Sequence, residues 1–263
     1  MEPPFRSLLY DRPDLYDLVF PDPGETLVGM CRQAFARYLP SPPTSLVDLG
    51  CGNGHHLVLL GASIAECWGV DVLESNIAFA RSRGSSCVFR DGDMRTVRLG
   101  RTFDAVICLG NALSYLLTDE ELAQGVATFD AHARPGSLLV LDLLNARCYL
   151  DGDGFRERIE GRIETPDFTA DSVAVHRLDR LTRRLKRTRT WRTPRQPDVV
   201  DVAEYRLLYP EEIRRLLGAG GFEVLAMYDN REFKDSDLAG TVTGEPDCAG
   251  MRGRKLYVFA RKS

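Results

Sequence analysis

Several features that would mark particular classes of protein are missing from this chain of 263 residues. No apolar run is long enough to cross a membrane as a helix, and the first residues lack the basic-then-apolar pattern of a secretion signal. The seven cysteines include no C-x-x-C pair, so neither a zinc knuckle nor a disulfide framework is indicated. The formal net charge of −4 is mild and by itself implies no polyanionic partner. These absences favour a cytoplasmic globular protein with free thiols.

The most informative stretch that is present runs over residues 45–80. A short apolar run ends on Asp48, and a glycine-dense turn, G-C-G-N-G, follows at residues 50–54. A helical segment comes next, and then a second apolar run that ends on Asp71. This order predicts a strand, a tight turn, a helix and a parallel strand, whose ligand would lie at the carboxyl ends of the two strands.

The residue types in this stretch indicate a nucleoside ligand. Glycines let the backbone turn sharply and let a ligand lie directly against it, and Asp71 can accept both hydroxyls of a ribose. A dinucleotide fingerprint would require a third glycine where His55 stands, and no Walker lysine follows the turn. We therefore expect a ligand that contains adenosine but is neither a dinucleotide nor bound by a P-loop.

The sequence V-D-L-G-C-G-N-G, with an acid ending the next strand, resembles the class I S-adenosylmethionine (SAM) dependent methyltransferase family. Three further segments resemble that family in the same order, and the resemblance covers roughly residues 45 to 145. They are the third acidic loop Gly92-Asp93-Met94-Arg95, the fourth strand with the loop Leu109-Gly110-Asn111, and Arg134-Pro135-Gly136-Ser137 before the fifth strand.

The resemblance implies an α/β fold with a Rossmann-like seven-stranded sheet, the last strand antiparallel, and SAM as the cofactor. It also implies a set of cofactor-binding residues, which we take as predictions: Tyr16, Asp48, Gly50, Cys51, Gly52, Asn53, Gly54, Asp71, Val72, Asp93, Met94, Leu109, Gly110 and Asn111. The catalytic candidates are Tyr16 and Tyr115, and the substrate-binding candidates are Tyr10, Phe20, Asn111, Tyr115 and Asn145. A turn-forming role for Asn145 is an equal alternative.

Residues 1–40 are expected to form an N-terminal lid and helical segment. The stretch L-Y-D-L-V-F at residues 15–20 resembles the Y-D-x-x-Y entry segment of small-molecule N-methyltransferases of the glycine and amino-sugar type. Tyr16 matches the first tyrosine, which in that family approaches the sulfonium end of SAM. Phe20 replaces the second tyrosine, so a hydroxyl role at that position does not carry over. Plain packing against the core is the alternative to a lid.

The remainder divides into a SAM-binding core, residues 41–150 and 210–263, and an insertion, residues 151–209. In the insertion, strand-like alternation replaces helical spacing and predicts an antiparallel meander, with strands near residues 173–177, 185–193 and 199–208. In the resembled family, insertions at this point cover the substrate site or make a dimer contact. Substrate choice is therefore expected to depend on this part of the chain.

The insertion also carries the basic cluster of the sequence, nine arginine and lysine residues between Arg177 and Arg195 interrupted by one acid, Asp179. Basic residues gathered on one face can contact nucleic-acid phosphates. On a hairpin, however, alternate residues point to opposite faces, and no RNA-binding module is recognisable. We favour a solvated sheet face over a nucleic-acid surface.

These features predict a SAM-dependent methyltransferase that acts on a small molecule. Methyl transfer requires nucleophile, carbon and sulfur to be aligned, and an amine nucleophile needs only to arrive deprotonated, whereas an alcohol usually needs a general base. None of the four histidines is a clear base, although His176 lies in the insertion. We therefore predict N-methylation of an amino sugar, an amino acid derivative or another natural-product intermediate.

Three other functions remain as alternatives. Small-molecule O-methylation is the closest, and RNA methylation or a SAM-binding protein that transfers nothing is further away. No metal site is indicated and no membrane partner is expected. The sequence leaves the oligomeric state open, with a homodimer or a higher homo-oligomer as options.

Overall fold

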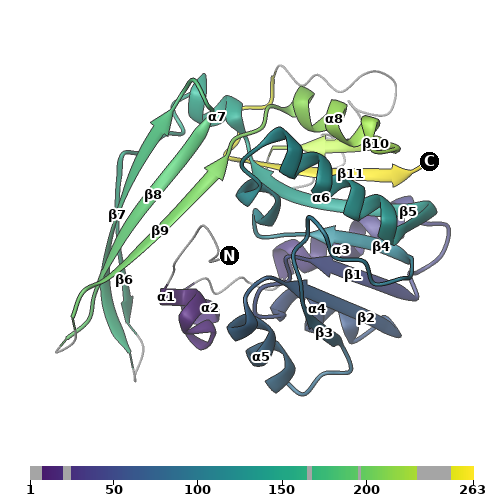
Figure 1. Cartoon of the computed structure of the whole chain (residues 1–263), viewed down its shortest axis with the longest axis horizontal. Helices are drawn as coiled ribbons and strands as arrows, with labels where there is room; N and C mark the ends of the chain where they lie inside the picture. The colour runs from purple at the N-terminus through teal and green to yellow at the C-terminus, as the bar shows by residue number, and fades with distance from the viewer. Residues whose placement is uncertain (1–7, 20–24, 165–167, 195–196, 230–249) are drawn as a thin grey trace.

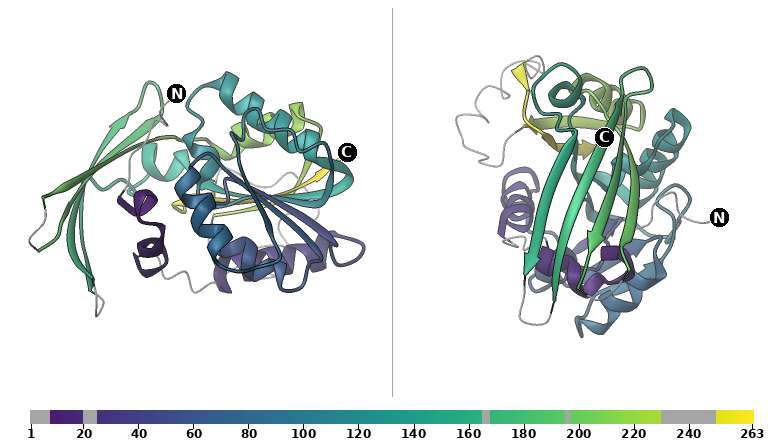
Figure 2. Two further views of the ribbon diagram at one scale, coloured as in Figure 1. Left: turned by 60° about the horizontal axis from the view of Figure 1, so that its bottom comes forward. Right: turned by 90° about the vertical axis from the view of Figure 1, so that its left-hand side faces the viewer.

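A computed structural model describes residues 8–19, 25–164, 168–194, 197–229 and 250–263. It contains two separate β-sheets, one of seven strands and one of four. The larger sheet carries helices, and the smaller sheet stands beside it with two short N-terminal helices between them (Figure 1, Figure 2).

The seven-stranded sheet has the strand order β10-β11-β5-β4-β1-β2-β3. Strand β11 runs antiparallel to both of its neighbours, and the pairs among β1 to β5 are parallel, as predicted from the family resemblance. The strands are β1 (Ser45–Leu49), β2 (Glu66–Asp71), β3 (Val88–Asp91), β4 (Phe103–Cys108), β5 (Ala133–Leu144), β10 (Phe222–Tyr228) and β11 (Lys255–Lys262).

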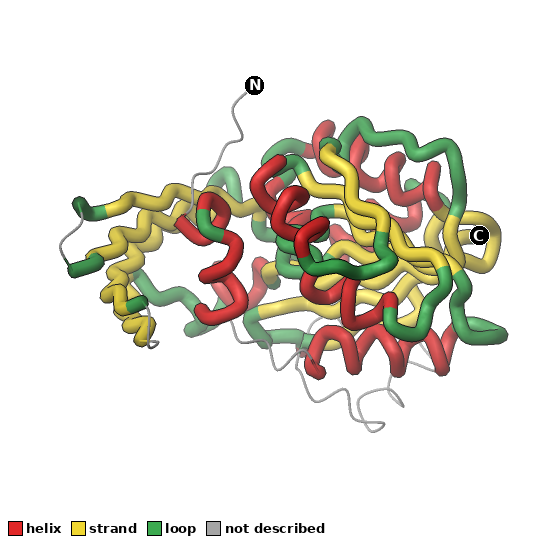
Figure 3. The backbone as a smooth tube through the Cα atoms, turned by 90° about the horizontal axis from the view of Figure 1, so that it is seen from below, coloured by secondary structure: helices red, strands yellow, loops and turns green. Residues whose placement is uncertain are grey.

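Both faces of this sheet are covered (Figure 3). Leu46 packs into a cluster with the helices on one face, and its neighbour Val47 packs into the cluster on the other. This explains why the central strands are apolar throughout rather than alternating. One face holds α3 (Glu25–Tyr38), α4 (His55–Gly61) and α5 (Glu74–Ser82); the other holds α6 (Asp119–His132) and α8 (Pro210–Ala219).

The second sheet is an antiparallel meander in the order β6-β7-β8-β9, inserted between the short helix α7 (Ala146–Leu150) and α8. Its strands are β6 (Arg158–Glu164), β7 (Thr169–Asp179), β8 (Arg184–Arg192) and β9 (Val199–Arg206). The meander itself was predicted, but β6 was missed. All its residues are exposed except the half-buried Ile163, so charged side chains obscure its pattern.

The N-terminal helices α1 (Leu8–Asp11) and α2 (Pro13–Val19) pack against the meander. Leu9 and Leu15 are buried in a cluster with Ala170 of β7 and Trp191 of β8. The fully buried carboxylate of Asp201 on β9 accepts hydrogen bonds from the backbone N–H of Leu8 (2.6 Å) and the indole of Trp191 (2.6 Å). The start of the described chain is thus fastened to the second sheet.

Candidate active site

Three loops that follow strands of the main sheet meet at the first glycine of the turn. Gly50 has φ +88°, and a Cβ atom built on it would lie 2.6 Å from Cβ of Ala112 and 3.0 Å from Cε of Met94. These two residues follow β4 and β3, respectively. Only a glycine fits here, because both the backbone angle and the close approach exclude a side chain. Predicted cofactor-binding loops after β1, β3 and β4 are therefore in direct contact.

The turn is braced by the end of β2. The backbone N–H groups of Gly50 and Cys51 donate to the carbonyl of Val70, at 2.8 and 3.0 Å. Asp71 accepts from the N–H of Gly52 (2.8 Å) through one oxygen and from the N–H of Leu73 (2.9 Å) through the other. Burial raises the pKa of Asp71, although these hydrogen bonds act to lower it. Asp71 thus stabilises the turn in addition to its predicted contact with ribose. The next residue, the predicted cofactor-binding Val72, is 49% exposed.

Two buried oxygen atoms at the ends of adjacent strands lack a hydrogen-bond partner among the described residues. They are Oδ1 of Asp48, on β1, and Oδ1 of Asn111, the residue with φ +63° that precedes the 3-10 helix η1 (Ala112–Tyr115) after β4. Buried acceptors normally have a donor. Their chemistry fits the ammonium group of SAM, which is a hydrogen-bond donor with a positive charge.

The charges around Asp48 also suit a positively charged ligand. Burial raises its pKa to about 7, His56 acts to lower the pKa, and the carboxylates of Asp71 and Asp142 raise it further. The carboxylates of Asp71 and Asp142 therefore both act on Asp48. A cation bound beside Asp48 would favour its ionised form.

Asp142 was not predicted as a site residue. Its carboxylate is fully buried, accepts from the backbone N–H of Gly110, and forms an ion pair with Lys255 at the start of β11. The pair fixes the loop after β4 to two neighbouring strands. No sequence signal joins residues 113 positions apart, so only the strand order brings them together.

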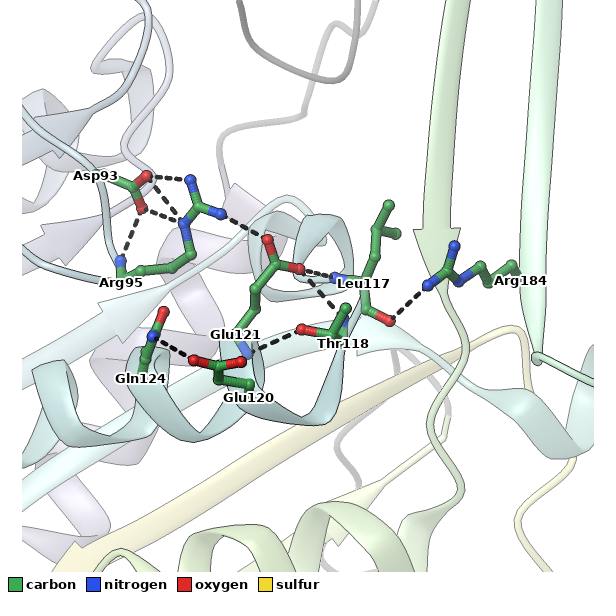
Figure 4. Close-up of polar contacts among 8 residues, drawn as sticks. All are labelled: Asp93, Arg95, Leu117, Thr118, Glu120, Glu121, Gln124 and Arg184. Atoms are coloured by element: carbon green, nitrogen blue, oxygen red, sulfur yellow. Dashed lines mark hydrogen bonds and ion pairs between the residues drawn. The ribbon is translucent and has the colours of Figure 1, made fainter. Parts of the chain in front are cut away.

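The third acidic loop is held by an ion-pair network rather than left open (Figure 4). Arg95 binds Asp93 (2.5 Å) and Glu121 (2.5 Å), and Glu121 also accepts from the N–H groups of Leu117 and Thr118. Burial acts to raise the pKa of Asp93, but Arg95 outweighs it and lowers the pKa. The network ties the loop after β3 to the capping box of Thr118 and Glu121 at the start of α6.

On the side of the second sheet, Tyr115 meets a tyrosine that sequence reasoning missed. The hydroxyls of Tyr115 and Tyr205 lie 3.3 Å apart, and their ring centroids are 4.9 Å apart. Tyr205 lies on β9, 90 residues further along the chain. Alternation along β9 could have placed it on one face, but not opposite Tyr115. The end of β4 and the second sheet are joined by these two phenols.

One residue of the predicted N-terminal lid, Pro13, contacts the glycine turn. The side-chain amide of Asn53, in the turn, donates to the carbonyl of Pro13 at 3.4 Å. Tyr16 of α2 is half-buried against the cluster that contains Trp191. Tyr10 belongs to α1, but its side chain lies outside the described part of the structure, as does Phe20 altogether. The catalytic and substrate roles of these residues stay predictions.

Two other residues have structural positions. Asn145 is fully buried, caps α7 by accepting from the N–H of Arg147, and donates to the carbonyls of Met251 and Gly253. This geometry favours the turn-forming alternative over a substrate contact. His132 is also buried, and its two ring nitrogens bond to the backbone of Leu99 and Thr128, so it offers no base.

The basic cluster is divided between the two faces of the second sheet. Lys186 is exposed on the outer face, whereas Arg187 and Arg189 are half-buried on the face that packs on α1, α2 and α7. The division of the charges between two faces was predicted, but the predicted solvation does not hold for these two arginines, which are half-buried. Their guanidinium groups lie over the rings of Tyr205 (5.6 Å) and Trp191 (5.2 Å).

Comparisons with known proteins agree with this geometry. Residues 46–136 match a family model described as a methyltransferase domain. The sequence is 33% identical over 134 residues to the dTDP-3-amino-3,4,6-trideoxy-alpha-D-glucopyranose N,N-dimethyltransferase of Streptomyces venezuelae, a match covering 50% of this chain and 56% of that protein. It is 33% identical over 131 residues to the dTDP-3-amino-3,6-dideoxy-alpha-D-glucopyranose N,N-dimethyltransferase of Streptomyces fradiae, covering 49% and 51%. The chain thus spans about half the length of the curated relatives it matches.

Solved structures match over nearly the whole chain. The Streptomyces venezuelae DesVI structure has a TM-score of 0.77 at 22% identity and covers 98% of this chain and 100% of that one. A SAM-bound amino pentose methyltransferase from Micromonospora echinaspora, involved in calicheamicin biosynthesis, has a TM-score of 0.69 at 25% identity and covers 98% of each chain.

Fold, glycine turn and matched domain together are those of the class I SAM-dependent methyltransferases, with SAM indicated as the cofactor. Within that class, the chain resembles the amino-sugar N-methyltransferases. In the described part of the chain, no helix is long and apolar enough to cross a membrane, and no group of side chains is arranged to hold a metal ion.

Proposed function

We propose that this protein transfers a methyl group from SAM to the amino nitrogen of a small-molecule amino sugar. When bound, SAM supplies a methyl group on a positively charged sulfur. The residues suited to hold the cofactor are Asp48, the turn at residues 50–54, Asp71 and Asn111. The curated relatives, named for N,N-dimethylation of dTDP-linked amino sugars, support this class of acceptor.

The choice of an amine as the acceptor rests on the two neighbouring phenols of Tyr115, on η1 after β4, and Tyr205, on β9. Tyr115 and Tyr205 offer hydroxyl groups that can orient an amine, and His132 is committed to the backbone. A neutral amine already has its lone pair, so the protein needs only to align it and exclude water. Such positioning can lower the activation barrier by roughly 7–11 kcal/mol. An oxygen nucleophile would usually need a general base as well.

The test is a methyl-transfer assay with SAM and matched acceptors. We would incubate the protein with a dTDP-linked amino sugar and with the same sugar bearing a hydroxyl in place of the amine, and detect products by mass spectrometry. A gain of one or two methyl groups on the amino compound alone supports the proposal. Methylation of the hydroxyl compound instead would make the protein an O-methyltransferase, and binding of SAM with neither product would indicate a non-catalytic SAM-binding protein.

A further inference from the structure

Two cysteines lie side by side at the outer edge of the main sheet. Cys67 is on β2, and Cys87 directly precedes the edge strand β3 (Figure 1). The residues that follow them, Trp68 and Val88, are partners in the parallel register of these two strands. Adjacent strands lie about 4.8 Å apart, which is within the Cα separation of about 4.4–6.8 Å that a disulfide bridges. The backbone therefore permits a bond between the two sulfur atoms.

Both sulfur atoms lie beside one position on α4. A Cβ atom built on Gly61 would lie 2.8 Å from Sγ of Cys87 and 3.5 Å from Sγ of Cys67. A hydrogen bond joins the two thiols to each other. The helix thus covers the pair with a residue that has no side chain, and the two sulfur atoms are close enough to react.

Cys87 differs from the other described cysteines in its exposure and its acidity. Its side chain is half-buried, whereas the other five are buried: Cys31, Cys51, Cys67, Cys108 and Cys148. The hydrogen bond from Cys67 lowers the pKa of Cys87 to about 7, although burial acts to raise it. The same hydrogen bond, together with burial, raises the pKa of Cys67. Near pH 7 the thiolate, which is the nucleophilic form, is therefore on Cys87 and the proton is on Cys67.

Packing alone does not require this arrangement. A buried cysteine such as Cys108 behaves as a small apolar side chain, and burial raises the pKa of its thiol. Redox-sensitive cysteines have instead a low pKa, contact with solvent and a second thiol within reach. Cys87 combines these three properties, with Cys67 as the second thiol. In a reducing compartment, a disulfide between such cysteines is typically transient.

We propose that Cys87 and Cys67 form a modification site, at which hydrogen peroxide converts the two thiols into a reversible disulfide. The Cys87 thiolate attacks one oxygen of the peroxide, the O–O bond breaks, and Cys87 sulfenic acid and hydroxide are formed. The sulfur of Cys67 then attacks the sulfur of Cys87 and displaces hydroxide, which takes the Cys67 proton and leaves as water. Two thiols and one peroxide thus give one disulfide and two waters. A small thiol reverses the oxidation by exchange at the half-buried sulfur of Cys87.

This site lies at the beginnings of β2 and β3, whereas the predicted cofactor residues lie at the other ends of the strands. The disulfide would enclose α5 and join the edge strand to its neighbour. It would therefore restrain opening of this edge of the sheet. The inference goes beyond the proposed function and does not depend on it.

Peptide mapping of the whole protein tests the site. Reduced protein is treated with equimolar hydrogen peroxide, its remaining thiols are blocked with N-ethylmaleimide, and a digest is analysed by mass spectrometry without reduction. We expect linked peptides that contain Cys67 and Cys87 and that separate after addition of dithiothreitol. Every protein in the comparison carries Cys248→Ser, because Cys248 lies outside the described residues.

Single variants separate the two steps. Cys67→Ser should leave Cys87 as a sulfenic acid that dimedone traps, whereas Cys87→Ser should form no sulfenic acid at Cys67. Cys148→Ala is the matched control, because it removes a buried thiol from the cluster beside the second sheet. It should form the disulfide at a rate within about twofold of the parent protein.

Several results would overturn the modification site. These are an unmodified Cys87 in both the parent protein and Cys67→Ser, a link from Cys87 to any other cysteine or to a second copy of the chain, and a sulfenic acid on Cys87 that persists while Cys67 is intact. Oxidation of Cys148 as fast as that of Cys87 would also reject it. The parent protein alone distinguishes these outcomes, so the proposal stays testable when a variant fails to fold.

Discussion

The hydroxyl of Tyr115 lies 3.3 Å from the hydroxyl of Tyr205 and joins the end of β4 to the second sheet. Tyr115 lies on η1, after a strand of the main sheet, and Tyr205 lies on β9 of the second sheet, and their rings contact each other at a tilt of 49°. This contact places a residue of the insertion beside the predicted methyl-transfer site. Changes in the insertion can therefore reach the chemistry without touching the cofactor loops.

Tyr205→Phe should lower kcat while leaving the affinity for S-adenosylhomocysteine within about twofold. The ring stays, so packing is kept, and only the hydrogen bond that orients Tyr115 is lost. We expect roughly a fivefold effect, since such a bond contributes about 1 kcal/mol. Steady-state kinetics would measure it. Tyr209→Phe is the control, because it removes a hydroxyl in the same apolar cluster that bonds instead to Asp151. Equal rates for wild type and Tyr205→Phe would remove the phenol pair from the mechanism.

Asp71→Ala should weaken cofactor binding by roughly 10- to 100-fold, since hydrogen bonds to a charged group contribute about 1.5–3 kcal/mol. The substitution removes both the predicted ribose contact and the brace to Gly52. Calorimetric titration with SAM and S-adenosylhomocysteine measures the loss. Glu74→Gln, an exposed acid at the start of α5, should leave the affinity unchanged. Wild-type affinity in Asp71→Ala would show that the βαβ assignment of this acid is wrong.

Asp48 should make folding stability depend on pH. Burial raises its pKa to about 7 in the folded protein, from an ordinary value of 3.8. Between these two pKa values the folded protein keeps a proton on Asp48 that the unfolded chain has released. The free energy of unfolding is therefore highest at low pH and falls as the pH rises toward 7. Compared with Asp48→Asn, the wild-type protein should lose up to about 1.4 kcal/mol per pH unit between pH 5 and pH 7, and little above that.

Urea unfolding of both proteins at each pH measures this difference. The asparagine variant supplies the control, because all other titrating groups are common to the two proteins. A difference in unfolding free energy that stays constant from pH 5 to pH 8 would contradict the raised pKa.

Asp201→Asn should loosen the N-terminal helices. One carboxylate accepts from both Leu8 and Trp191, and an amide can accept through only one of its two ends. We expect a loss of about 1–3 kcal/mol in unfolding free energy and faster hydrogen exchange at the amide of Leu8. Asp198→Asn is the control, an exposed acid paired with Arg192, where the loss should stay below about 1 kcal/mol. Unchanged exchange at Leu8 would show that Asp201 does not fasten the helix.

Much of the main sheet could be predicted because its signals are local. The turn at residues 50–54 requires glycines at positive φ, and Asp48 near the end of β1 and Asp71 at the end of β2 each follow an apolar run. The capping box of Thr118 and Glu121 is likewise a local feature, because its T-x-x-E pattern spans only four residues. Strand β6 was missed because it is an exposed edge strand, where water accepts charged residues and the apolar pattern is weak.

The sequence by itself determined the cofactor turn and most of the succession of strands and helices along the core, since each depends on backbone angles and side-chain periodicity over a few residues, and the class of fold followed from the family resemblance. Only the tertiary structure decided which residues far apart in the chain became partners. Lys255 meets Asp142 because β11 lies beside β5, and Tyr205 meets Tyr115 because the second sheet turns one face toward the core. Packing against this one face also explains why Lys186 is exposed and its neighbour Arg187 is half-buried. Alternation predicts that neighbours on a strand point opposite ways, but which side is covered depends on what packs against it.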